Sequence, residues 1–228
     1  MKIEFCVTSY EGAVAAEQFK ADRIELCSRL DLDGLTPSLH LIQQCRLEYN
    51  GEIHIMIRPE CGPFICNDSI LNKMQDSIVK SAEIGVNGVV FGVLNDNNEI
   101  NTKATASLVK IAKRYHLETT FHRAFDHLTD PIASVKQLHN LGINRILCSG
   151  SNSNVEKGIQ LLKKLKITAQ NDIEIMAGGG VNQYNAHILQ QIGLDAIHFS
   201  IHNNKDNTPV YNEVNEEKIK SILRALEY

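Results

Sequence analysis

Three ionisable side chains lie close together in the segment FHRAFD, which runs from Phe121 to Asp126. His122, Arg123 and Asp126 follow LETT, a run whose residue types are typical of an extended strand. A chain usually leaves a strand through Gly, Asn or Pro rather than through charged residues. A histidine beside an arginine and a carboxylate suits proton transfer and the binding of a negatively charged group, so we interpret FHRAFD as a strand that ends at a functional site. A salt-bridge network that only closes the structure is the alternative.

A second segment, AGGGVN, predicts a site for an anion. Three consecutive glycines, Gly178, Gly179 and Gly180, offer backbone N–H groups that no side chain shields, just ahead of a helical segment. We expect them to lie beside Ser149 and Gly150 of CSGS and beside Ser200 of HFS, and to hold a phosphate or a carboxylate. The alternative is a plain turn, which glycine favours because it adopts positive φ without strain.

Two kinds of segment alternate along the chain and must position these residues. Short runs rich in β-branched and apolar residues predict strands at residues 2–8, 23–28, 52–58, 88–94, 117–123, 145–150, 173–178 and 196–201. Between them, apolar residues recur at helical spacing in residues 10–21, 38–49, 70–85, 106–115, 132–142, 158–167, 185–193 and 218–228. This repetition predicts an α/β fold, a (β/α)8 TIM barrel that forms a single domain over residues 1–228, with an open doubly wound sheet as the alternative.

The alternation within the strands predicts a polar barrel interior. In EIHIMIR, Ile53, Ile55 and Ile57 are expected to face the helices, which directs His54, Met56 and Arg58 inward. The same parity directs inward Glu4, Cys6, Thr8, Glu25, Cys27, Thr120, His122, His198 and Ser200. Barrel interiors are mostly Val, Ile and Leu, and a buried charge is costly unless it is paired or functional. Because active sites lie at the C-terminal ends of barrel strands, we expect the site there.

Cys6 and Cys27 form a third candidate site, because both are expected to point inward from adjacent strands. Thiolate and thioether ligands favour Cu(I), and an inward pair of thiols can reach one ion. The alternative is that both are small buried apolar residues, since free cysteine is among the most buried residue types. Cys61 and Cys66 lie near each other in RPECGPFICND, but the chain has no CxxC motif that would indicate a structural zinc site.

Charge and hydropathy exclude several classes of partner. The chain of 228 residues carries 23 basic and 27 acidic side chains, so it lacks the positive excess typical of proteins that bind nucleic acid or anionic lipid. No apolar run approaches the roughly 18 residues of a membrane span, and the first residues do not resemble a secretion signal. We therefore expect a soluble cytoplasmic protein without nucleic-acid or membrane partners.

The order and spacing of several motifs resemble the CutC family of copper homeostasis proteins. The motifs are ADRIELCS (21–28), GLTPS (34–38), IRP (57–59), FHRAFD (121–126), ILCSG (146–150) and MAGGGV (176–181), and the resemblance covers most of the chain. It implies a TIM barrel, a cytoplasmic location, self-association as a dimer or tetramer, and a role in copper handling with Cu(I) bound by cysteines. Carried onto this chain, the copper ligands fall on Cys6 and Cys27, and the polar mouth on Glu25, Arg58, His122, Arg123, Asp126 and His198.

One segment departs from the family pattern. After IRP the family typically has a basic residue and GG-D-F-x-Y, whereas this chain has Glu60 to Cys66, ECGPFIC. The loop has changed its charge and gained two thiols, so ligand contacts that the family makes there are not carried over.

Two functional hypotheses follow, and they leave open whether the protein is an enzyme. In the first, it is a copper homeostasis protein that holds Cu(I) through Cys6 and Cys27 without turnover. In the second, it is a TIM-barrel enzyme acting on a small anionic or phosphorylated substrate at the barrel mouth. There the glycine loop and Ser200 would hold the anion, Arg58 or Arg123 would stabilise developing negative charge, and Glu25 or His122 would transfer protons. A polar network that is merely satisfied is the remaining alternative.

Overall fold

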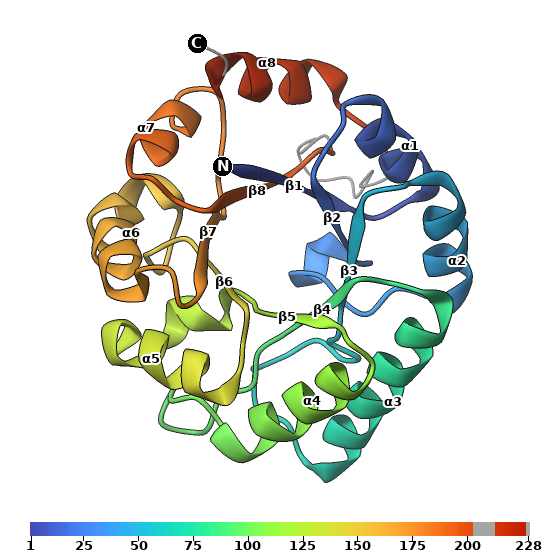
Figure 1. The fold of residues 1–228 in the computed structure, drawn as a ribbon, viewed down its shortest axis with the longest axis vertical. Helices are drawn as coiled ribbons and strands as arrows, with labels where there is room; N and C mark the ends of the chain where they lie inside the picture. Colours follow the sequence, from blue (N-terminus) through green and yellow to red (C-terminus); the bar gives the residue numbers. More distant parts are fainter. Residues whose placement is uncertain (203–212, 227–228) are drawn as a thin grey trace.

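A computed structural model describes residues 1–202 and 213–226 and shows a closed parallel barrel surrounded by helices (Figure 1). Within these residues the strands follow the order β1 to β8 around the barrel: β1 Lys2–Val7, β2 Arg23–Leu26, β3 Glu52–Met56, β4 Gly88–Phe91, β5 Glu118–Phe121, β6 Arg145–Cys148, β7 Glu174–Gly178 and β8 Ala196–Ser200. β8 pairs with β1 and closes the sheet, which confirms the (β/α)8 prediction over the open sheet.

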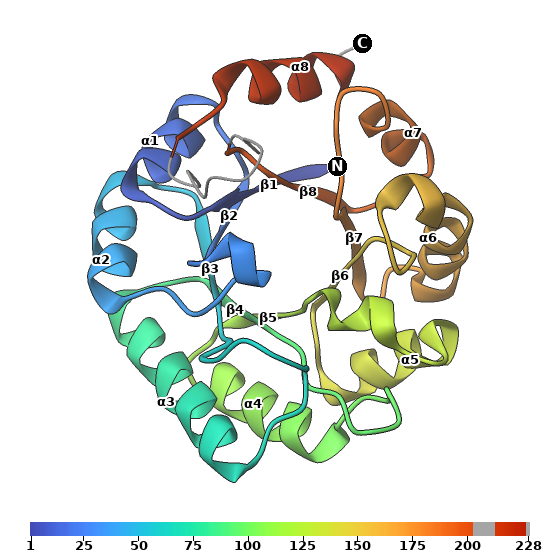
Figure 2. The ribbon, with the colours of Figure 1, turned by 180° about the vertical axis from the view of Figure 1, so that it is seen from behind.

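The helices form the outer layer in both views (Figure 2). They are α1 Tyr10–Gln18, α2 Leu39–Glu48, α3 Asp68–Ile84, α4 Thr102–Arg114, α5 Pro131–Leu141, α6 Val155–Ala169, α7 Ala186–Gln191 and α8 Glu216–Leu226. Two 3₁₀ turns, η1 Leu30–Leu32 and η2 Arg123–His127, follow β2 and β5. Among the described helices, none has the length and apolar character required to cross a lipid bilayer.

Local capping explains where the longer helices begin and end. The Asn67 side chain accepts a hydrogen bond from the Ile70 N–H at the start of α3, and Asp130 accepts one from the Ala133 N–H at the start of α5. α3 ends at Gly85, which has a φ of 87° that glycine adopts without steric penalty. These short-range signals mark the boundaries between the strand–helix units.

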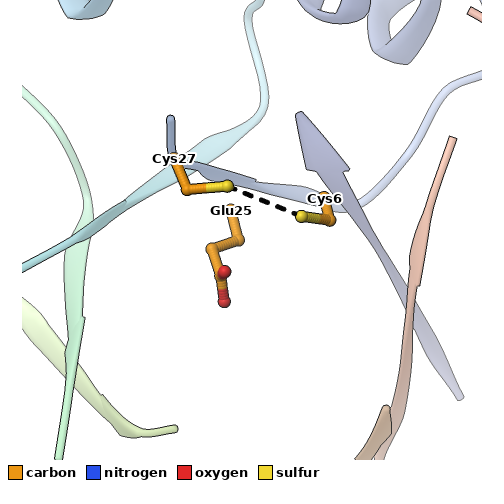
Figure 3. A group of neighbouring side chains, drawn as sticks. All are labelled: Cys6, Glu25 and Cys27. Carbon is orange, nitrogen blue, oxygen red and sulfur yellow. Dashed lines mark hydrogen bonds between the residues drawn. The ribbon is translucent and has the colours of Figure 1, made fainter. Parts of the chain in front are cut away.

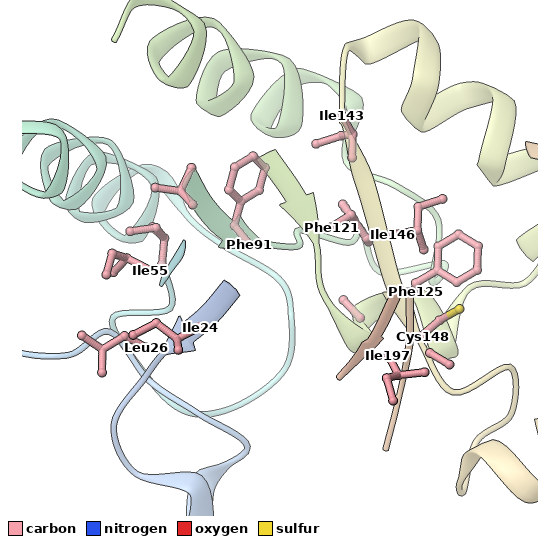
Figure 4. Packing of buried hydrophobic residues seen from close by; sticks show 14 of the residues in the cluster. Ile24, Leu26, Ile55, Phe91, Phe121, Phe125, Ile143, Ile146, Cys148 and Ile197 are labelled. Atoms are coloured by element: carbon pink, nitrogen blue, oxygen red, sulfur yellow. The ribbon is translucent and has the colours of Figure 1, made fainter. Parts of the chain in front are cut away.

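The main hydrophobic core lies between the barrel and the helices (Figure 4). Ile53, Ile55 and Ile57 of the EIHIMIR segment are all fully buried in it, as predicted. Inside the barrel, by contrast, the apolar residues do not form one continuous core but two small separate clusters. One consists of Cys6, Cys27, Met56 and Val90, and the other of Leu147, Met176 and Ala196. Charged side chains occupy much of the remaining interior.

Two buried arginines neutralise the acidic residues at the N-terminal end of the barrel. Arg23 pairs with Glu4, and Arg145 donates to Glu174 at 2.5 Å and to Glu118 at 3.0 Å. Arg23 and Arg145 are almost completely inaccessible to solvent. A guanidinium can donate hydrogen bonds to several carboxylates at once. These pairs therefore allow charged side chains inside the barrel, where apolar residues are usual.

His54 lies beside this charged layer without a hydrogen-bond partner. Neither of its ring nitrogens makes a hydrogen bond within the described residues, and the ring lies against Gly88, where an added Cβ would approach it to 2.6 Å. Burial, together with the positive charge of Arg145, lowers the pKa of His54 well below its ordinary value. The imidazole is therefore neutral in the folded protein at neutral pH.

We predict that His54→Gln reduces the acid sensitivity of folding. Because the pKa of His54 is lower in the folded than in the unfolded chain, this residue destabilises the fold progressively as pH falls below the unfolded value of about 6.5. At pH 5.5 that contribution is about 1.4 kcal/mol relative to pH 8. Urea unfolding of the wild type and of His54→Gln at both pH values measures it. An equal loss of stability in both proteins would show that His54 is not the responsible group.

Candidate functional site at the barrel mouth

A pocket of about 340 Å³ opens at the C-terminal ends of the strands. The segment around η1, light blue in Figures 1 and 2, lies over the barrel interior and contributes Leu30, Asp33 and Gly34 to the lining. Of the residues predicted from the sequence, the pocket brings together Cys6, Glu25, His122, Arg123, Gly179, Gly180, His198 and Ser200. The strands position most of these side chains through the inward parity of the barrel.

Cys6 and Cys27 lie together beside this pocket (Figure 3). Their sulfur atoms are 3.7 Å apart, and both side chains are buried free thiols. A carboxylate oxygen of Glu25 completes a group whose potential ligand atoms all lie within 4.8 Å of one another. The contact with Cys27, together with burial, raises the pKa of Cys6 well above its ordinary value. The Cys6 side chain is therefore a thiol at neutral pH.

His198 is held in position by Glu4. The His198 Nδ1–H donates to Glu4 Oε1 at 2.7 Å, and Glu4 is also paired with Arg23. Burial alone raises the pKa of Glu4, but Arg23 and His198 outweigh it and lower that pKa below its ordinary value. For His198, burial lowers the pKa, but Glu25, Cys6 and Glu4 raise it well above the ordinary value. The imidazole of His198 is therefore positively charged.

Glu25 is a carboxylate at the floor of the pocket that has an oxygen without a hydrogen-bond partner. Its Oε2 has no hydrogen-bond partner in the described part of the chain and lies 4.0 Å from His198 Nδ1. Burial raises the pKa of Glu25 to about 7, with His198 opposing this effect and Glu4 adding to it. A carboxyl group with this pKa can both accept and release a proton near neutral pH.

His122 faces the pocket as a neutral imidazole. Its Nδ1 accepts a hydrogen bond from the Ala124 N–H at 3.1 Å, which leaves the ring proton on Nε2. Burial, assisted by the charge of Arg58, lowers the pKa of His122 to about 3. The ring packs against Phe64, with 5.0 Å between the ring centroids. His122 can therefore donate a hydrogen bond but does not supply a charge.

Asp126 explains the charged residues of FHRAFD. It accepts hydrogen bonds from the Arg123 side chain at 2.9 Å, from the Ser149 N–H at 2.8 Å and hydroxyl at 2.9 Å, and from the Gly150 N–H at 3.2 Å. This carboxylate joins η2 to the loop after β6 and fixes Arg123 at the rim. The sequence predicted that Ser149 and Gly150 lie beside a bound anion and that Asp126 lies at the polar mouth. None of these three residues lines the pocket.

Arg58 also lies outside the pocket lining. Its guanidinium donates to the carbonyl oxygens of Leu32 at 2.6 Å, Gly34 at 3.1 Å and Gly62 at 3.0 Å, and lies over the Phe64 ring. Backbone acceptors of two loops thus take three of the five N–H donors of Arg58, and a contact of Arg58 with a ligand stays a prediction. Arg58 instead fixes the divergent loop so that Phe64 reaches the pocket. Cys61 is exposed there and Cys66 partly buried, and both are free thiols.

The glycine loop contributes two of its three glycines to the lining. Gly179 and Gly180 both have a φ of 95°, which L-residues with side chains rarely adopt. A Cβ on Gly179 would lie 2.8 Å from Cζ of Arg123, so the absence of a side chain lets the guanidinium pack onto the backbone. Gly178 lies below the surface, where a Cβ would approach Leu147 to 2.5 Å, and it does not line the pocket.

Lys218 is a pocket residue that the sequence analysis missed. It lies on α8 and lines the pocket, and its ammonium group has no hydrogen bond or ion pair with the residues of the two described ranges. Burial lowers the pKa of Lys218. The sequence signal was weak because KIK in an amphipathic helix usually indicates a solvated face. Only its place directly after β8, where barrels often bind anions, distinguishes it.

The closed barrel of eight parallel strands with alternating helices defines this chain as a TIM-barrel protein, with a charged pocket at its C-terminal mouth. The chain belongs to the CutC family, whose model matches residues 1–203. A CutC family protein of Glaesserella parasuis is 42% identical over 201 residues, which cover 88% of this chain and 82% of that protein. The human copper homeostasis protein cutC homolog is 38% identical over 205 residues, which cover 90% of this chain and 74% of the homolog.

Solved structures agree with this assignment. The crystal structure of CutC from Streptococcus agalactiae has a TM-score of 0.81 at 33% sequence identity, covering 87% of this chain and 97% of that chain. A 3-hexulose-6-phosphate synthase from Salmonella typhimurium has a TM-score of 0.66 at 14% identity, covering 99% of this chain and 98% of that chain. At this identity the second comparison shows only that the fold is shared.

We predict that Asp126→Ala lowers the free energy of unfolding by about 3 kcal/mol, because it leaves buried donors and Arg123 without their acceptor. Urea denaturation measures the loss. Asp76→Ala is the matched control, since Asp76 pairs with Lys80 on the exposed surface of α3, and we expect it to cost less than about 0.5 kcal/mol. Similar losses in the two variants would contradict the proposed structural role of Asp126.

Proposed function

We propose that this protein acts in copper homeostasis by binding Cu(I) at Cys6 and Cys27. The observation that carries the proposal is the 3.7 Å separation of two buried free thiols. Thiolates are soft ligands that select Cu(I) among biological metal ions. Such thiols must be kept reduced, which fits a cytoplasmic location. Self-association as a dimer or tetramer stays a prediction from the family resemblance.

The sulfur separation favours a bent arrangement over the linear one that two thiolates alone usually give. For metal–sulfur bonds of about 2.3 Å, the length of zinc–thiolate bonds, two sulfurs 3.7 Å apart subtend an angle of roughly 110° at the metal. A linear geometry at the same bond length requires a separation of about 4.6 Å. The bent angle leaves room for a third ligand. Met56, in the same apolar cluster as the two cysteines, supplies a soft thioether, and Glu25 supplies an oxygen.

Proton release should accompany binding at this pair. The pKa of Cys6 is raised by the contact with Cys27 and by burial, so the metal must displace protons from thiols. A group whose proton is displaced by a ligand binds that ligand less tightly as pH falls. We therefore expect the affinity for Cu(I) to be lower at pH 6 than at pH 8.

We predict that Cys6→Ser combined with Cys27→Ser weakens Cu(I) binding at least about 100-fold, because hydroxyls are poor ligands for this soft ion. Titration of the reduced protein with Cu(I) against a chromophoric chelator under anaerobic conditions measures the affinity. The matched control is Cys61→Ser combined with Cys66→Ser, which removes the same number of thiols from the divergent loop and should leave the affinity unchanged.

The same titrations can also contradict the proposed copper site. Equal affinities for the wild type and the Cys6/Cys27 variant would exclude this pair as the copper site. A loss confined to the Cys61/Cys66 variant would assign the ion to the divergent loop instead.

A further inference from the structure

Two positively charged side chains line the pocket, and one of them, Lys218, has no negative partner in the described part of the chain. Lys218 of α8 has no hydrogen-bond or ion-pair partner among the residues that the structure describes, although burial lowers its pKa. Arg123 lines the same pocket, and only its Nε is used, by Asp126, which lies outside the lining. A partly buried cation that no protein group neutralises is costly, so this side of the pocket favours an anionic ligand.

The backbone beside these cations is shaped for close approach. Gly179 and Gly180 share a φ of 95° and present main chain rather than side chain to the pocket. Ser200 at the end of β8 adds a hydroxyl from the neighbouring strand. Successive glycine N–H groups, a hydroxyl and cationic side chains are the groups with which proteins bind phosphate.

At the floor of the pocket lies a pair of groups suited to proton transfer. Glu25 presents a carboxylate oxygen with no hydrogen-bond partner in the described ranges, and its side chain is 3% exposed. His198 lies beside it and lines the pocket; Glu4 holds its Nδ1 and not its Nε2, and the Cys6 side chain is a further hydrogen-bond partner of the ring. A buried carboxylate oxygen without a hydrogen-bond partner, next to an imidazole oriented through Nδ1 and with the anion-binding groups nearer the rim, is an arrangement for acid–base chemistry on a phosphorylated molecule.

We propose that the pocket is also a catalytic site, in which Lys218, Arg123 and the Gly179–Gly180 backbone hold the phosphate of a small α-hydroxy carbonyl compound while Glu25 and His198 move its protons. The volume of about 340 Å³ is at the small end of ligand pockets and restricts the substrate to a few carbons beyond the phosphate. The activity is proposed for the protein with free cysteines, because Glu25 cannot accept a proton while its carboxylate binds a metal.

The proton transfers balance without a redox partner. The Glu25 carboxylate accepts the proton from the carbon next to the carbonyl, and the C–H electron pair forms the carbon–carbon double bond of an enediol. The carbonyl π electrons move to oxygen, which takes a proton from Nε2 of His198. Return of the proton from Glu25 to either carbon, and of a hydroxyl proton to His198, gives back the substrate or its isomer.

The binding half of the proposal is tested by calorimetry with inorganic phosphate and with 2-phosphoglycolate, a phosphate ester carrying a carboxylate in place of the enediolate. We expect both to bind, the ester more tightly, and Lys218→Met to weaken both at least about 10-fold by removing a charge-assisted contact. Lys220→Met is the matched control, because Lys220 lies on the same helix but pairs with Glu216 at 2.9 Å.

The comparison of the two ligands separates a site for free phosphate from a site for a phosphate ester. Binding of inorganic phosphate alone would show a site for the free ion and overturn the catalytic proposal. No binding of either ligand, or equal weakening by Lys218→Met and Lys220→Met, would overturn the anion site itself.

The chemical half is tested by NMR in D2O with dihydroxyacetone phosphate and ribulose 5-phosphate as probes. We expect the wild type to exchange the carbon-bound hydrogen next to the carbonyl for deuterium. The Glu25→Gln variant should exchange it at least about 100-fold more slowly while still binding phosphate. Lys220→Met should exchange at the wild-type rate. Phosphate binding without exchange of either probe, or exchange that survives Glu25→Gln, would overturn the assignment of Glu25.

Discussion

The buried pair between Arg23 and Glu4 is the interaction on which the arrangement of the pocket depends. Arg23 holds Glu4 ionised inside the barrel, against the effect of burial, and Glu4 in turn fixes His198 through Nδ1. The charge of His198 then lies beside Glu25, whose pKa burial raises to about 7. Without the guanidinium, Glu4 would be expected to take up a proton and lose its hold on the imidazolium. A group at the base of the barrel therefore sets the protonation of groups at its mouth.

A second buried carboxylate organises the opposite side of the mouth. Asp126 joins η2 to the loop after β6 and orients Arg123, whose guanidinium lies against the glycine backbone after β7. The Asp126 side chain thus connects the segments after β5 and β6 directly and the segment after β7 through Arg123, although Asp126 itself does not line the pocket. Because Arg123 is held at Nε, its remaining N–H groups stay available at the rim.

The sequence predicts the fold well because barrel parity is a local property of each strand. Ile53, Ile55 and Ile57 identify the outer face without reference to any other segment, and the inner positions of Cys6, Glu25, His122 and His198 follow by alternation. Residues beyond the strand ends do not obey this alternation. Arg58 turns to the carbonyl groups of two loops and Ser149 to Asp126, since loop conformation depends on long-range contacts that a periodic pattern does not encode. Lys218 was missed for the same reason, because its importance arises from where α8 packs.

Glu25 connects the two proposed sites, the cysteine pair and the acid–base pair. The same carboxylate lies within 4.8 Å of both sulfur atoms and 4.0 Å from His198, so it belongs to the cysteine cluster and to the charged network. Two thiolates around one Cu(I) ion would carry one net negative charge where two thiols carry none, so this charge would raise the pKa of Glu25 further unless its carboxylate itself binds the ion. Thiolates formed on metal binding would also add negative charge next to His198 and strengthen its protonation. If Cu(I) binds there as proposed, occupation of the sulfur pair would therefore shift the acid–base balance of the pocket floor through charge alone.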